Sequence, residues 1–128
     1  MVGERGSAGV VLLAAAVVVL LLTLAVVAVG QYLAGYSRAR AAADAAALAA
    51  APVTFRPFGA EGSPLREARI FAGANGAELV SCDCGHDPSW EPRTVVVTVR
   101  RVFPVLLLGS RSVRATARAE FVPTRLLE

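Results

Sequence analysis

The apolar positions of this chain are concentrated in one uninterrupted run near its N-terminus. Residues 6–37 carry no charged side chain, and residues 8–29 are all Ala, Val or Leu except for Gly9 and Thr23. A helix of 22 residues is about 33 Å long, which matches the roughly 30 Å hydrocarbon layer of a bilayer. The pattern therefore predicts a transmembrane helix over residues 8–29, preceded by a short leader over residues 1–7.

A cleavable signal peptide is the alternative reading of this run. Signal peptides have a clearly positive leader and an apolar core of about 7–15 residues. In this chain the core is longer, and Glu4 offsets the charge of Arg5. We therefore expect the helix to remain attached, with cleavage near Ala28 as the alternative.

Helix-forming residues continue beyond the apolar run. Residues 31–51 are dominated by Ala and contain no proline until Pro52, which should end the helix. Tyr32 and Tyr36 lie one turn apart, at the height where aromatic side chains gather at a membrane surface. The sequence predicts a helical stalk over residues 30–51, which either packs on a small sheet or stands alone.

The remaining residues, 52–128, predict a small domain with one short helix. Ser63 and Pro64 form an N-cap followed by a proline in the first turn. Asn75 and Gly76 both tolerate the left-handed conformation with which helices often end. Residues 53–62 contain proline and glycine without a regular period and are expected to form a loop.

Apolar and polar residues then alternate with a period of two. The alternation predicts strands over residues 79–84, 94–103 and 111–122. In the third, Val113 and every second residue to Phe121 face one way, while polar side chains face the other. One buried and one wet face are typical of an antiparallel sheet with a helix on one side, which gives an α+β fold with about three strands.

The segment between the second and third strands is unusually apolar for a hairpin tip. It reads FPVLLLG over residues 103–109. The side chains of this candidate patch are Phe103, Val105, Leu106, Leu107 and Leu108. Such a patch suggests contact with lipid or with a partner, and burial within the domain is the alternative.

Cys82, Cys84 and His86 have the spacing C-x-C-x-H, which would place all three on one face of a straight strand. A tetrahedral zinc site needs a fourth ligand, and the chain has no other Cys or His. We therefore expect no metal. Outside the cytoplasm the two thiols should be oxidised, either to each other across a turn at Gly85 or to another chain.

Nothing in the sequence favours catalysis or nucleic-acid binding. His86 beside Asp87 does not make a catalytic triad, and both the C-x-x-C redox spacing and a glycine-rich phosphate loop are missing. The net charge of +3 is not concentrated in a basic block. We expect no enzyme activity, no cofactor, no small-molecule substrate and no nucleic acid, and we expect Trp90 to plug the sheet edge.

The order of apolar helix, stalk and small antiparallel sheet resembles type IV pilin-like proteins. The residues are closer still to the TadE/TadG-like proteins of the tight-adherence (Flp pilus) machinery, in their short actinobacterial TadE-like form. The segments that carry the resemblance are GERGSAGVV at residues 3–11, ADAAALAAA at 43–51, ANGAELVSC at 74–82 and FPVLLLGSRSVRATARAEF at 103–121.

The resemblance implies a non-enzymatic, minor pilin-like component of a Flp pilus assembly or a type II/IV-related secretion system. Its partners would be the membrane and other pilin-like or secretion-machinery subunits. A prepilin-type peptidase would cut between Gly6 and Ser7, and Val11 stands where the family usually has a glutamate. The alternative function is a membrane-anchored extracytoplasmic binding module.

Two indications of orientation disagree. Arg38 and Arg40 follow the apolar run while Arg5 precedes it, and by the positive-inside rule this count leans toward a cytoplasmic domain. The resemblance instead implies a single-pass protein in the cell membrane with residues 52–128 outside the cytoplasm. We give the resemblance precedence over the small difference in charge.

Overall fold

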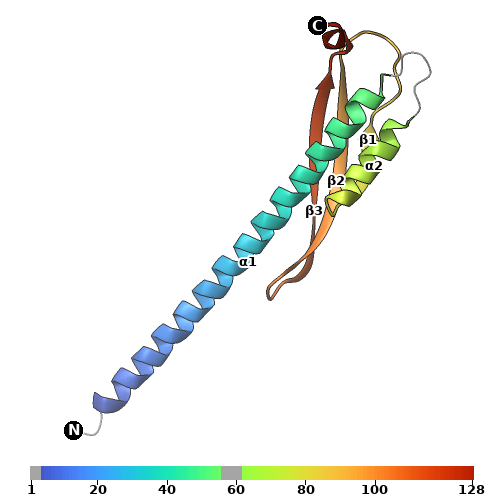
Figure 1. Ribbon diagram of the computed structural model, residues 1–128. Coiled ribbons are helices and arrows are strands. Elements are labelled where there is room, and N and C mark those ends of the chain that lie inside the picture. Colours follow the sequence, from blue (N-terminus) through green and yellow to red (C-terminus); the bar gives the residue numbers. More distant parts are fainter. Residues whose placement is uncertain (1–3, 56–61) are drawn as a thin grey trace.

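The computed structural model describes residues 4–55 and 62–128 (Figure 1). The elements are the helices α1 (Glu4–Val53) and α2 (Pro64–Ala74), the strands β1 (Glu78–Asp83), β2 (Arg93–Val105) and β3 (Gly109–Phe121), and the 3-10 helix η2 (Pro123–Leu127). The three strands form one antiparallel sheet in the order β1-β2-β3. The predicted α+β fold, with a long apolar helix, one short helix and a three-stranded sheet, is confirmed.

The helix α1 is continuous from the apolar run through the alanine-rich segment. Pro52, which was expected to end the helix, lies instead within its last turn. Beyond that turn the backbone bonds tighten, with the amides of Thr54 and Phe55 donating to the carbonyls of Ala51 and Pro52, each at 3.2 Å. The Thr54 hydroxyl also donates to the Ala51 carbonyl, at 2.6 Å. The helix therefore ends two residues later than predicted.

The alanine-rich half of α1 is a packing surface. Its buried residues recur at helical spacing and are at most 4% exposed: Ala39, Ala42, Ala43, Ala46, Ala47, Ala50 and Ala51. The sheet and α2 lie along this half of the helix, whereas the N-terminal half projects alone (Figure 1). Alanine side chains allow the backbones to approach closely, so the core is built from small residues on the helix side. The structure thus decides between the two alternatives for the stalk.

The face of the sheet turned toward α1 is formed by alternate residues of β2 and β3. Its buried side chains are Val95, Val97, Val99, Val113, Ala115, Ala117 and Ala119. Valines of β2 lie opposite alanines of β3, as in the pair Val97 and Ala117. This is the one-sided burial that the period-two pattern predicted.

The helix α2 has the caps that the sequence predicted. The Ser63 hydroxyl accepts from the backbone amide of Arg66 at 3.4 Å, and Gly76 has a positive φ of 72°. At the C-terminal end, Nη1 of Arg101 donates to the carbonyls of Asn75 and Gly76 at 3.0 and 2.9 Å. A guanidinium at this end also interacts favourably with the helix dipole, so Arg101 ties α2 to the sheet.

Candidate functional site: the hairpin tip on the apolar helix

The N-terminal half of α1 exposes its large apolar side chains all round. Leu12 is 71% exposed, Leu20 58% and Val26 71%. By length and composition this helix could cross a membrane. A continuous apolar surface of this size marks a region that is covered by lipid or by other proteins.

The hairpin of β2 and β3 extends along α1 toward this apolar half (Figure 1). Its last cross-strand pairs are Phe103 with Arg111 and Val105 with Gly109, and residues 106–108 form the tip. The strands are therefore longer at this end than predicted, and Pro104 lies within β2, paired with Ser110.

The candidate patch proves to be smaller than its sequence suggested. Phe103 and Val105 are buried within the domain, at 8% and 4% exposure, so they are not available to a partner. Leu106, Leu107 and Leu108 remain exposed, at 40%, 77% and 54%. The difference arises because β2 continues its alternation through residue 105, which turns Phe103 and Val105 toward α1.

The Phe103 ring packs against α1 at Gly35. A Cβ atom on Gly35 would collide with the Phe103 ring, so the ring occupies the space that any other residue would fill. The Tyr32 ring lies one turn away, with its centroid 6.0 Å from that of Phe103. This aromatic contact joins the hairpin to the helix just beyond the apolar run.

A hydrogen bond joins the two elements one turn closer to the N-terminus. The backbone amide of Leu106 donates to Oε1 of Gln31 at 2.7 Å. Within the tip, the amide of Leu108 donates to the carbonyl of Val105 at 3.1 Å. Two of the backbone donors of the tip thus have acceptors inside the protein. No local sequence pattern indicates this role of Gln31.

The tip contains a leucine in a conformation that favours glycine. Leu107 has a φ of +65° at the third position of the turn 105–108. Type II turns require a positive φ at this position and normally place Gly or Asn there. For a residue with a Cβ the cost is about 1–2 kcal/mol, and in water Leu107 gains little in return because its side chain is the most exposed of the three.

An apolar hollow of about 370 Å³ lies between the tip and the helix. It is lined by Leu21, Leu24, Ala25, Ala28, Val29, Leu106, Leu107 and Leu108. The helix residues of this lining all belong to the apolar run. The tip therefore lies beside the predicted transmembrane segment and not above it.

Polar and basic side chains surround the hairpin on its domain side. A second hollow, of about 330 Å³, is lined in part by Gln31, Arg38, Arg101 and Phe103. Arg111, opposite Phe103 in the sheet, is exposed. The leucine tip is thus followed, toward the domain, by a level that carries positive charge.

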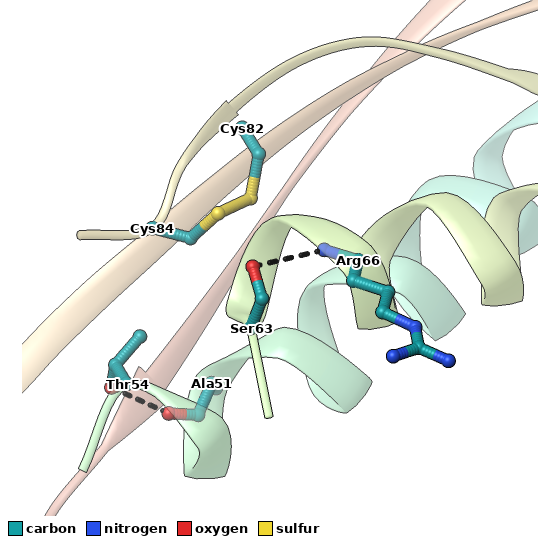
Figure 2. The surroundings of a disulfide bond; sticks show 6 residues. All are labelled: Ala51, Thr54, Ser63, Arg66, Cys82 and Cys84. Atoms are coloured by element: carbon teal, nitrogen blue, oxygen red, sulfur yellow. Dashed lines mark hydrogen bonds between the residues drawn. A yellow bond between two sulfur atoms is a disulfide. The ribbon is translucent and has the colours of Figure 1, made fainter. Parts of the chain in front are cut away.

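The two cysteines form a disulfide at the other end of the domain. Their Cα atoms are 5.3 Å apart, and the bond lies near the end of α1 and the start of α2 (Figure 2). Because β1 ends at Asp83, Cys84 and His86 are outside the strand and do not continue its face. The C-x-C-x-H spacing therefore does not place three ligands on one strand, and residues 4–55 and 62–128 contain no group of three or more Cys, His, Asp or Glu suited to a metal ion.

Trp90 and the predicted processing site lie far from the hairpin. Trp90 packs edge to face on Phe55, with centroids 4.9 Å apart, and Phe55 in turn contacts Phe121 of β3. Trp90 thus packs on Phe55 at this end of the domain, and its role in plugging the sheet edge remains a prediction. Gly6 and Ser7 lie in the first turns of α1, and cleavage between them remains a prediction.

The N-terminal part of the chain matches a protein-family model. Residues 6–52 match the family model described as Tad, putative Flp pilus-assembly TadE/G-like. No curated protein and no solved structure matches the chain significantly. The resemblance noted in the sequence is confirmed over these residues, which include all of α1 except its first two residues and its last. Over residues 6–52, the chain is thus similar to the TadE/G-like proteins of Flp pilus assembly.

Proposed function

We propose that this protein is a non-enzymatic, minor pilin-like component of a Flp pilus assembly or a related secretion system, anchored by a single transmembrane helix. The observation that carries the proposal is that the family match falls on α1, whose N-terminal half exposes its apolar side chains. In this proposal residues 8–29 cross the membrane after a leader over residues 1–7. Residues 30–51 form the stalk and residues 52–128 the extracytoplasmic domain.

The disulfide supports an extracytoplasmic position of the domain. Disulfides persist in oxidising compartments and are rare in the cytosol. Both cysteines of the chain are joined in this bond. The bond therefore favours the orientation implied by the resemblance over the one suggested by the arginine count.

Association with other pilin-like helices would use small residues of α1. Gly9, Ala16, Thr23 and Gly30 recur every seven residues and so follow one face of the helix. Neither Gly9 nor Gly30 has an atom near the position of a Cβ, so both leave room for another backbone. At 100° per residue this face lies about 130° around the helix from the one that carries the hairpin, so both can be occupied at once.

Mass spectrometry of the protein extracted from its native membranes tests this function. We expect either a chain that begins at Ser7, or an intact start together with co-purifying pilin-like subunits. A soluble chain that begins near residue 29 or 30, without such subunits, would contradict the proposal and favour an exported binding module.

Orientation is tested separately with alkaline phosphatase fused after Glu128. The enzyme folds actively only outside the cytoplasm, so an active fusion is expected. An inactive but expressed fusion would contradict the extracytoplasmic domain, and a fusion that ends at Arg5 is the matched negative control.

A further inference from the structure

We propose that the tip of the β2–β3 hairpin, residues 106–108, is a second membrane-inserted element, placed in the hydrocarbon of one leaflet beside α1. The occupant of the exposed leucine surface is thus the lipid acyl chain. This inference rests on the proposal that residues 8–29 of α1 cross the membrane.

The position of the tip along α1 determines its depth. The helix residues that line the hollow beside the tip extend from Leu21 to Val29, the last residue of the apolar run. At 1.5 Å per residue, Leu21 lies about 12 Å below Val29 along the helix axis. Half of a 30 Å hydrocarbon layer is about 15 Å, so the tip enters one leaflet and does not reach the other.

Two of the three backbone donors of the tip have acceptors within the protein, which lowers the cost of moving the tip out of water. Backbone donors in hydrocarbon must be satisfied within the protein. The amide of Leu106 donates to Gln31, and that of Leu108 donates to Val105. By accepting this bond, the Gln31 side chain also gains a partner at the edge of the apolar run.

The strained turn supports the same conclusion from a different direction. Leu107 adopts a positive φ, for which Gly or Asn would be the ordinary choice, and its side chain is 77% exposed in the isolated chain. A leucine kept in such a conformation needs a benefit that the protein itself does not provide. Contact with acyl chains provides that benefit, and the apolar hollow of about 370 Å³ beside it offers space for one chain.

The charges around the hairpin match the head-group level. Arg111 follows Gly109, the first residue after the tip, by two residues, which places it about 7 Å from Gly109 along the strand. Arg38 lines the hollow on the domain side, and Tyr32 and Tyr36 are both partly exposed on α1. Arginines and tyrosines at this height meet lipid phosphates and the interfacial layer, as membrane anchors do.

Depth-dependent quenching of tryptophan tests the proposal in the full-length chain. The protein is reconstituted in phosphatidylcholine vesicles whose acyl chains carry bromine either near the glycerol or near the methyl end. The probe variant is Leu108→Trp in a Trp90→Phe background, because Leu108 is exposed and does not hold the strained position. Leu106→Trp in the same background is the second probe, in case the first fails to fold.

We expect blue-shifted emission from the hairpin probe, stronger quenching by the shallow bromine than by the deep one, and protection from aqueous acrylamide. The unaltered chain, with Trp90 at the far end of the domain, should not be quenched by either bromine. Leu20→Trp with Trp90→Phe reports on α1 itself and should be quenched.

Comparison of the Leu20 probe with the hairpin probe distinguishes failure of the inserted hairpin from failure of the transmembrane anchor. A quenched Leu20 probe with an unquenched, acrylamide-accessible hairpin probe would overturn the inserted hairpin and leave the anchor intact. If the Leu20 probe is also unquenched, α1 does not cross the membrane, and the proposed function fails together with the hairpin.

Discussion

Replacing Gly35 with alanine tests whether the hairpin is locked onto α1 at one position. The added methyl group would overlap the Phe103 ring, because the space beside Gly35 is filled by ring atoms. Forcing extra volume into a packed contact costs about 1–3 kcal/mol. Alanine in place of glycine returns at most about 1 kcal/mol through helix propensity. We therefore expect a net loss of up to about 2 kcal/mol in the free energy of unfolding of the domain.

The matched control is Gly30→Ala, five residues earlier on the same helix. No atom lies near the position of its Cβ, so only the gain in helix propensity remains. The control should be neutral or slightly stabilising. Its comparison with Gly35→Ala isolates the collision from any general effect of removing a helical glycine.

The assay is thermal unfolding of the full-length protein in detergent micelles, followed by near-UV circular dichroism. A domain of this size loses roughly 4–8 °C in Tm for each kcal/mol, so a clear drop is expected for Gly35→Ala. Adding Phe103→Leu should make room for the methyl group and recover part of the loss, with a coupling of about 0.5–3 kcal/mol. Equal Tm values for Gly35→Ala and Gly30→Ala, or strict additivity in the double variant, would refute the contact.

Three further predictions concern the rest of the domain. Reducing the disulfide should lower the free energy of unfolding by at most about 2 kcal/mol, because the closed loop is very short, and unfolding with and without reductant measures this. The backbone amide of Ser89 donates to the Asp87 carboxylate and, with the Ser89 side chain and Arg93, lowers the pKa of Asp87 below its usual value of 3.8. The stabilisation by ionised Asp87 is therefore present above pH 4 and is lost as the pH falls through the lowered pKa. Asp87→Asn should lower the free energy of unfolding at pH 6 and leave it unchanged at the acid end of a pH series. Arg101→Met should lower the free energy of unfolding by about 1–2 kcal/mol, because it removes two charge-assisted bonds to the end of α2. Arg100→Met, the control, breaks only an exposed ion pair with Glu78 and should lower it by less than about 1 kcal/mol. Denaturant titration measures both.

The regular parts of this fold could be predicted from local patterns. The alternation from Val113 to Ala119 depends only on which face of the strand is buried, and the structure buries that face. Ser63 and Gly76 predict the ends of α2 because caps depend on neighbouring residues alone. The long helix followed from composition, and only its end near Pro52 differed.

The hairpin contact could not be predicted, because its partners are about seventy residues apart. In the sequence, Gly35 indicates only a weak point in a helix, and Gln31 only the end of an apolar run. Their contacts with Phe103 and Leu106 depend on how far the sheet is displaced along α1, which no local period records. For the same reason Phe103 and Val105 were assigned to the exposed patch. Arg101 interrupts the apolar alternation before them and obscures the continuation of the strand.

These two contacts also determine where the domain sits along the helix. The alanine face of α1 has nearly the same shape at every turn. Its burial alone therefore hardly distinguishes the observed position of the sheet from one shifted by a turn, or 5.4 Å. A shift toward the N-terminus would bring the Phe103 ring to residues that have a Cβ, and it would separate the amide of Leu106 from Gln31. One glycine and one amide side chain thus select a single position on an otherwise repetitive surface. Because both lie within six residues of Val29, the height of the domain is fixed relative to the end of the apolar run, and any membrane that α1 spans meets the hairpin at the leucine tip.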